Sequence, residues 1–163
     1  MSLYRARMIK AGLADLPLRI SSYQFRKRQS PLESYLQVVT PEIDLAGDIA
    51  DRADGELVLD RWDGAAWAEV ARANVESPRT DRGASSVSIT IAGHKTVTYS
   101  SPVTVALQGG QTTSESTSGR RIRALPDHAI RPGDTATWGS LSFVAGLITY
   151  TGSATAEYMD VSE

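Results

Sequence analysis

Short runs of alternating apolar and polar residues recur along this chain of 163 residues. The clearest run, over residues 86–91, places Val87, Ile89 and Ile91 between serines and a threonine. Successive side chains of a strand point to opposite faces of a sheet, so a period of two is typical of a strand with one buried face. Turn residues separate such runs about every 8 to 12 residues. The pattern predicts an all-β fold, mainly antiparallel, built as a barrel or sandwich of about nine or ten short strands.

One segment departs from this pattern. Within residues 42–53, apolar side chains recur at spacings of three and four, at Ile43, Ala46, Ile49 and Ala50. These spacings place side chains on one face of a helix. We therefore expect one short helix there, and no other helix longer than two turns except at the N-terminus.

A hairpin is indicated at Asp63-Gly64, which lies between two runs rich in Val, Leu and Trp. Asp-Gly supplies the positive backbone angles that a tight hairpin turn needs. Trp62 and Trp67 flank this turn, and we expect them to pack against each other across the two strands. An exposed pair of tryptophans could instead stack on a sugar or another aromatic ligand.

Further turns and loops punctuate the second half of the chain. Residues 131–134 read RPGD, in which Pro fixes one turn angle and Gly permits the next. A second corner is expected at residues 138–140 (WGS), followed by one strand over residues 141–150. Residues 77–85 are expected to form a polar loop. Residues 110–119 are polar throughout, which predicts a mobile loop that becomes ordered only against a neighbour.

Composition limits the classes of protein. The chain has no cysteine, which excludes disulfides and thiolate chemistry and suits assembly in a reducing cytoplasm. With 17 basic and 19 acidic residues the net charge is -2, so no strong field attracts nucleic acid. Charges interrupt the apolar residues of the N-terminus, so neither a signal peptide nor a membrane segment is expected. We expect a single β-rich unit over residues 1–163, or two small β modules of about residues 1–80 and 81–163.

No motif for catalysis, metal binding or cofactor binding is apparent. The two histidines, His94 and His128, lack the paired spacing of metal ligands. No GxSxG elbow, phosphate-binding loop or dinucleotide fingerprint is present. We therefore predict that the chain is not an enzyme, has no catalytic or metal-ligating residue, and needs no cofactor.

Two short basic runs remain as candidate protein interfaces. The first comprises Arg26, Lys27 and Arg28, and the second comprises Arg120, Arg121 and Arg123. In a near-neutral chain such runs favour contact with acidic protein surfaces over contact with nucleic acid.

The chain also resembles a known class of proteins. Its segments SYLQVVTP, RADGELVLDR, IAGHKTV, RRIRAL, IRPGDTATWGSLSFVAGLITY and EYMDVSE are similar to those of tail and baseplate structural proteins of long-tailed bacteriophages, in particular the hub-type β modules of the tail tip. The resemblance extends from about Ser21 to Glu163 and includes no catalytic signature. It implies a non-enzymatic structural subunit of the tail tip or baseplate that works through protein–protein contacts.

The resemblance also implies an assembly. The chain would form a homo-oligomer, as a trimer or hexamer ring, bind other tail or baseplate proteins, assemble in the host cytoplasm and reside in the virion. Its basic runs would contact acidic residues of a neighbour, such as Asp48, Asp51 and Asp54. Charge reversal at Arg121 and Arg123 would then leave the isolated fold intact and lower the yield of complete tails.

Two alternatives come from other functional classes. A receptor- or carbohydrate-binding module would use Trp62, Trp67 and Trp138 as a stacking platform, and ligand would quench their fluorescence. A small hydrolase with a dispersed site would be revealed by a peptidoglycan or esterase assay.

Overall fold

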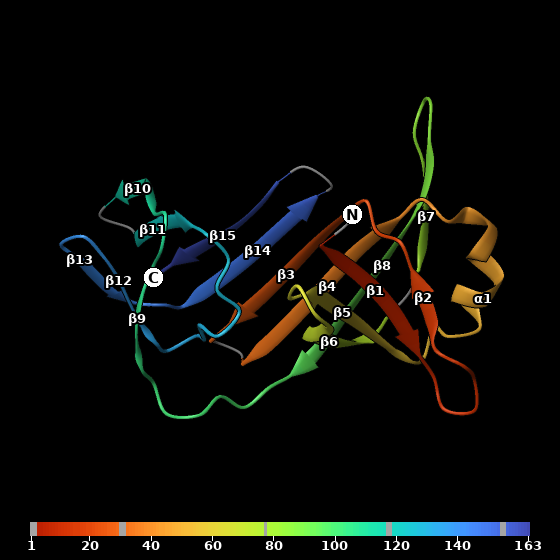
Figure 1. Cartoon of the computed structure of the whole chain (residues 1–163), viewed down its shortest axis with the longest axis horizontal. Helices are drawn as coiled ribbons and strands as arrows, with labels where there is room; N and C mark the ends of the chain where they lie inside the picture. Colours follow the sequence, from red (N-terminus) through yellow and green to blue (C-terminus); the bar gives the residue numbers. More distant parts are fainter. Residues whose placement is uncertain (1–2, 30–31, 77, 117–118, 154–155) are drawn as a thin grey trace. The chain divides into compact units, whose positions relative to one another are not determined.

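The computed structural model describes residues 3–29, 32–76, 78–116, 119–153 and 156–163 (Figure 1). Its strands are β1 Tyr4–Ile9, β2 Leu16–Leu18, β3 Ser22–Arg28, β4 Glu33–Thr40, β5 Glu56–Trp62, β6 Trp67–Val75, β7 Arg79–Arg82, β8 Val87–Thr96, β9 Thr104–Ala106, β10 Gln111–Ser116, β11 Gly119–Ala124, β12 Thr135–Trp138, β13 Leu141–Val144, β14 Leu147–Ser153 and β15 Glu157–Ser162. A 3-10 turn, η1 Ile43–Leu45, leads into one short helix, α1 Ala46–Ala50. The predicted all-β fold and the predicted short helix are both confirmed.

The pairings given for the described strands are mainly antiparallel, and β9 and β12 pair in parallel. The described residues contain fifteen strands, more than the expected nine or ten, because several strands have only three or four residues and two lie in segments that the sequence predicts as loops. No pairing among the described strands closes a barrel.

The chain forms two compact units, and neither is continuous in sequence. The first contains Met1–Gln24 and Tyr35–Lys95, and the second contains Phe25–Ser34 and Thr96–Glu163. The chain therefore passes from the first unit to the second within β3, returns within β4 and leaves again at the end of β8. The organisation as one structural unit or two sequential modules stays a prediction.

The first unit is a sheet in the order β4-β8-β6-β5-β1-β2, with β7 paired to β8. The β5–β6 hairpin turns where expected, because Gly64 has a φ of 107° and Asp63 Oδ1 accepts hydrogen bonds from the amides of residues 65 and 66. Trp62 lies opposite Trp67, with ring centroids 5.5 Å apart, which confirms the predicted cross-strand pair. The core consists of alternate residues of these strands, including Ala6, Met8, Leu36, Val38, Leu57, Leu59 and Ile91.

The second unit contains the strands β10-β11-β15-β14, the C-terminal half of β3 and a small sheet in the order β13-β12-β9. Its core includes Phe25, Ile122, Ile130, Ile148, Tyr150, Met159 and Val161. The RPGD segment forms a turn, as predicted: Gly133 has a φ of 95°, and buried Asp134 accepts hydrogen bonds from the amides of Arg131 and Val103. Gly139, with a φ of 57°, forms the corner between β12 and β13.

Three local predictions require correction. Residues 141–150 form two strands, β13 and β14, because the chain turns at Gly146, whose amide donates to the carbonyl of Ser162. Most of residues 110–119 form β10, which pairs with β11; residues 117 and 118 lie outside the described part. Within residues 77–85, the four residues of β7 pair with β8. Backbone pairing to a neighbouring strand stabilises both polar segments without any apolar side chain.

Candidate functional site

The first basic run lies on β3, where alternation separates its three side chains. Arg26 and Arg28 are exposed, whereas Lys27 is only 7% exposed and points to the core side. Lys27 Nζ donates to the carbonyl oxygens of His128 and Ile130 at 2.7 and 2.8 Å, and lies 5.3 Å from the ring centroid of Tyr150. Burial lowers the pKa of Lys27 to about 8. Lys27 therefore acts inside the second unit, holding the chain between β11 and β12.

The second basic run lies on β11, and two of its arginines bind one buried aspartate. Asp160 of β15, whose side chain is 5% exposed, lies opposite Arg123 in the register. Arg123 donates from Nε and Nη2 at 3.1 and 3.0 Å, and Arg121 donates from Nη2 at 2.8 Å. Burial raises the pKa of Asp160, but the hydrogen bonds from Arg123 and Arg121 outweigh burial, so the pKa is below its ordinary value.

This carboxylate fixes two guanidinium groups side by side on the surface. The guanidinium carbon of Arg123 also lies 3.9 Å from the ring centroid of Tyr158, and both arginines keep 40% to 50% of their side-chain surface exposed. Charge reversal at both arginines would place two carboxylates beside buried Asp160. The expectation that such a variant keeps its isolated fold intact is therefore replaced by an expectation of destabilisation.

Four of the six predicted residues share one face of the sheet β3-β14-β15-β11. Phe25 and Lys27 contact the ring of Tyr150 on the core side, so the intervening residues of β3 point outward. Thr149, the outward neighbour of Tyr150, pairs with Asp160, which faces the two arginines of β11. We call these four residues, Arg26, Arg28, Arg121 and Arg123, the arginine face.

The two arginine pairs of this face are separated by β14 and β15. β3 and β11 are three strand spacings apart, so their backbones are separated by about 14 Å. Arg120 is the sixth predicted residue and alternates to the other side, where its Nη1 donates to the carbonyl of Ser142 at 2.8 Å. The structure therefore brings together four of the six residues, and it places Lys27 and Arg120 elsewhere in the second unit.

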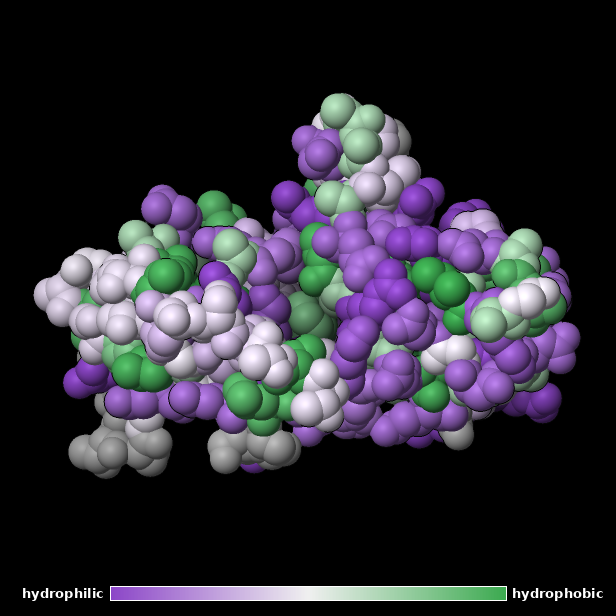
Figure 2. All heavy atoms as spheres, turned by 90° about the horizontal axis from the view of Figure 1, so that it is seen from below, coloured by the Kyte–Doolittle hydropathy of each residue, from purple (hydrophilic) through white to green (hydrophobic). Residues whose placement is uncertain are grey.

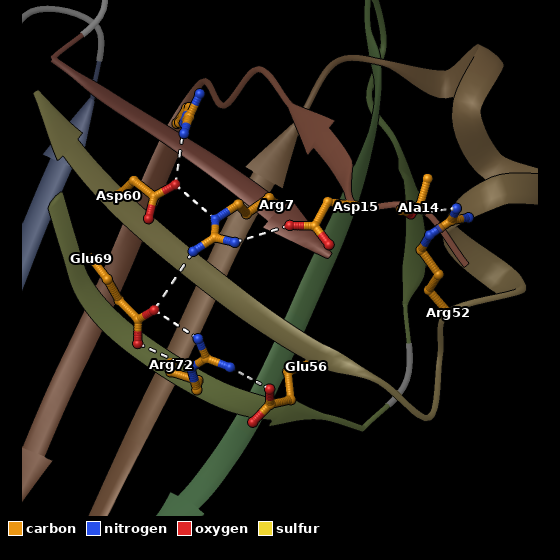
Figure 3. Close-up of polar contacts among 9 residues, drawn as sticks. Arg7, Ala14, Asp15, Arg52, Glu56, Asp60, Glu69 and Arg72 are labelled. Carbon is orange, nitrogen blue, oxygen red and sulfur yellow. Dashed lines mark hydrogen bonds and ion pairs between the residues drawn. The ribbon is translucent and has the colours of Figure 1, made fainter. Parts of the chain in front are cut away.

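The sequence analysis missed a similar cluster in the first unit (Figure 3). Asp60 of β5 is 2% exposed and binds two arginines of β1, with Oδ2 at 3.1 Å from Arg5 Nε and 2.9 Å from Arg7 Nε. Arg5 also lies over the ring of Trp67, 4.6 Å from its centroid. As at Asp160, one buried carboxylate binds two arginines spaced i, i+2 on the adjacent strand. The two arginines spaced i, i+2 in the segment YRARMI are the feature of the sequence that could have indicated this cluster.

Further ion pairs extend this cluster across the outer surface of β1, β5 and β6. Arg7 reaches Asp15 at 3.0 Å and Glu69 at 3.6 Å. Glu69 accepts from Arg72 at 2.7 Å, and Arg72 also pairs with Glu56. Because each cation of the cluster faces carboxylates of its own unit, this network stabilises the sheet and leaves little net charge for a partner.

An acidic surface lies on the helical segment of the first unit. Residues 42–54 contain five carboxylates and one base, Arg52. Arg52 is buried, donates to the carbonyls of Asp48 and Ala14, and lies 3.9 Å from the carboxylate of Asp48. Asp44, Asp48 and Asp51 are exposed and recur at spacings of four and three, which places them on one side of the segment. We call residues 42–54 the acidic segment.

The hydropathy of the surface differs between the units on the face viewed from below in Figure 2. Hydrophilic side chains predominate over the first unit, on the right of the view, whereas the second unit is mostly pale and partly apolar. The segment of residues 97–110, which has no charged residue, runs along this side of the second unit (Figure 1). Its Val103 is 48% exposed.

The remaining candidates from the sequence have structural contacts. His94 pairs with Glu76 at 3.3 Å, and His128 stacks on Tyr150 with centroids 4.7 Å apart. The ring of Trp138 packs closely against the backbone of Gly110. Among the described residues no group of three or more His, Asp or Glu side chains could hold a metal ion. No helix in the described ranges has the length and apolar character needed to cross a bilayer.

Comparison with known proteins supports the fold. No family model matches the chain, and no curated protein matches its sequence. A solved structure does match: the c3393 protein of E. coli, described as a component of the type VI secretion system with structural similarity to the bacteriophage T4 tail proteins gp27 and gp5. The TM-score is 0.56 at 5% identity, over 96% of this chain and 75% of that chain. The chain thus shares its fold with a protein described as similar to phage tail proteins, which confirms the resemblance to tail and baseplate proteins at the level of the fold.

Proposed function

We propose that the chain is a non-enzymatic structural subunit of a phage tail tip or baseplate, or of a related secretion apparatus, and that it acts through contacts with other proteins of the assembly. The observation that carries this proposal is the structural match, which extends over 96% of the chain to a protein described as similar to phage tail proteins. A match of this extent leaves little of the chain for a separate catalytic module.

The charged clusters are consistent with a structural role. Two of the buried aspartates, Asp60 and Asp160, each bind two arginines of the neighbouring strand and so hold adjacent strands together. We assign partner recognition to the arginines and aspartates that are exposed at the surface. Within this proposal the chain assembles in the host cytoplasm, binds other tail proteins, forms a trimer or hexamer ring and ends in the virion.

The experiment that tests the proposal is deletion of the coding sequence from its native genome. We expect particles or secretion complexes without complete tails by electron microscopy, and their restoration by a plasmid copy of the gene. Mass spectrometry of purified tails should find the chain in a copy number that is a multiple of three. Complete, functional tails in the deletion strain would contradict the proposal.

A further inference from the structure

We propose that copies of this chain bind one another head to tail, with the arginine face of one copy against the acidic segment of the next. This inference rests on the proposed function, because it names the partner of the same exposed arginines. It follows from two surfaces of opposite charge on one chain, each organised by its own unit.

The arginine face is built to present cations outward. Alternation on β3 exposes Arg26 and Arg28 while Lys27 is buried, and Asp160 fixes Arg121 and Arg123 in place. Four arginines share this face with buried Asp160, so basic side chains outnumber acidic ones there. Arginine suits such a surface because its planar fork binds a carboxylate through two hydrogen bonds.

The acidic segment offers carboxylates at a compatible spacing. Asp44 and Asp48 are four residues apart, which is about 6 Å along a helix, and Arg26 and Arg28 are two residues apart, which is about 7 Å along a strand. Ile43 is 48% exposed beside these aspartates and adds apolar surface that a bare charged patch lacks. Two different surfaces joined in this way form a heterologous contact, which closes into a ring when the rotation allows.

The two ends of the acidic segment are engaged within the first unit. Glu42 pairs with Arg19 at 3.0 Å, and Asp54 pairs with Lys10 at 2.6 Å. Asp48 also lies 3.9 Å from Arg52. The exposed Asp44 and Asp51 therefore carry most of the charge that a second copy would meet. A second copy supplies the complementary surface without any further protein, which is why we assign the partner to this chain.

The test uses two complementary variants of the full chain. The basic-face variant is Arg26→Glu/Arg28→Glu, which spares the arginines that hold Asp160. The acidic-segment variant is Asp44→Lys/Asp51→Lys, which spares the ion pair of Asp54 with Lys10. The control is Arg79→Glu/Arg82→Glu, which changes the charge of exposed β7 by the same amount as the basic-face variant. Circular dichroism melts establish that all variants fold.

Sedimentation velocity then measures self-association. We expect the wild type and the control to associate, with the dissociation constant rising about tenfold or more between about 50 and 500 mM salt. Each of the two test variants alone should stay monomeric. An equimolar mixture should associate again, because the acidic segment of the basic-face variant meets the intact arginine face of the acidic-segment variant, and the two reversed surfaces are also complementary in charge.

Several results would overturn the inference: a wild type that is monomeric at every concentration, test variants that associate like the control, or a mixture that does not associate. A wild type that stays monomeric and binds a DNA duplex through Arg26 and Arg28 would assign the arginine face to nucleic acid and equally overturn it. Failure of the proposed self-association can be distinguished from failure of the proposed function. A monomeric chain that is still required for complete tails would leave that function standing.

Discussion

Buried Lys27 allows a quantitative prediction about the pH dependence of stability. Its pKa is lowered from 10.5 to about 8 by burial, while its ammonium donates to two backbone carbonyls. A tenfold change in proton affinity corresponds to about 1.4 kcal/mol, so keeping this lysine charged costs the folded state about 3 kcal/mol at pH 7.

The sign follows from proton binding. Between pH 8 and 10.5 the unfolded chain holds a proton on Lys27 that the folded chain has released, so the free energy of unfolding rises with pH in this window. The free-energy cost of keeping buried Lys27 charged is present in full below pH 8 and decreases above pH 8. Relative to a Lys27→Met variant, the wild type should gain about 2 kcal/mol between pH 7 and pH 9.5. Limiting the measurements to pH 9.5 and below avoids ionisation of Tyr99, because burial raises the pKa of Tyr99 to about 12.

The assay is urea unfolding of both proteins at each pH. In a Trp62→Phe/Trp67→Phe background, fluorescence reports Trp138, which lies in the same unit as the buried side chain of Lys27. The control is Lys95→Met, which removes a lysine that is 39% exposed. A difference between wild type and Lys27→Met that stays constant from pH 7 to pH 9.5 would refute the assignment of Lys27 as a buried, desolvated cation.

Two further predictions concern packing and the buried carboxylate. Gly93→Ala should lower the free energy of unfolding by at least about 2 kcal/mol, because the new Cβ would lie 2.0 Å from a backbone oxygen of β6. Gly47→Ala, with open space around it in α1, should raise it by up to about 1 kcal/mol, and equal melting temperatures of the two variants would contradict this reasoning. Asp160→Ala should cost about 1 to 3 kcal/mol, since it leaves Arg121 and Arg123 without their shared carboxylate at a half-exposed site. Because the pKa of Asp160 is lowered, this cost should be present near pH 7 and shrink as the pH falls below the ordinary aspartate pKa of about 4 and through the lowered pKa of the folded state, as measured by thermal unfolding.

Features that depend on neighbouring residues were predictable from the sequence. The alternation of apolar residues determined the strands, the spacing of Ile43, Ala46 and Ile49 determined the helical segment, and Asp63-Gly64 determined the hairpin that pairs Trp62 with Trp67. Each of these signals acts within a few residues, because side-chain direction and turn angles are local properties of the backbone. The fold class followed from the sum of such signals.

Features that depend on distant residues were decided only by the tertiary structure. Lys27 looked like one of three equivalent cations until the fold brought it to carbonyls about a hundred residues away, where desolvation sets its pKa. Arg123 meets Asp160 across 37 residues, and only strand pairing shows that four arginines of the two basic runs share a face. The polar residues of β10 form a strand because their backbone pairs with β11. Pairing energy and burial depend on which segments meet, and alternation along one strand carries no information about its partner.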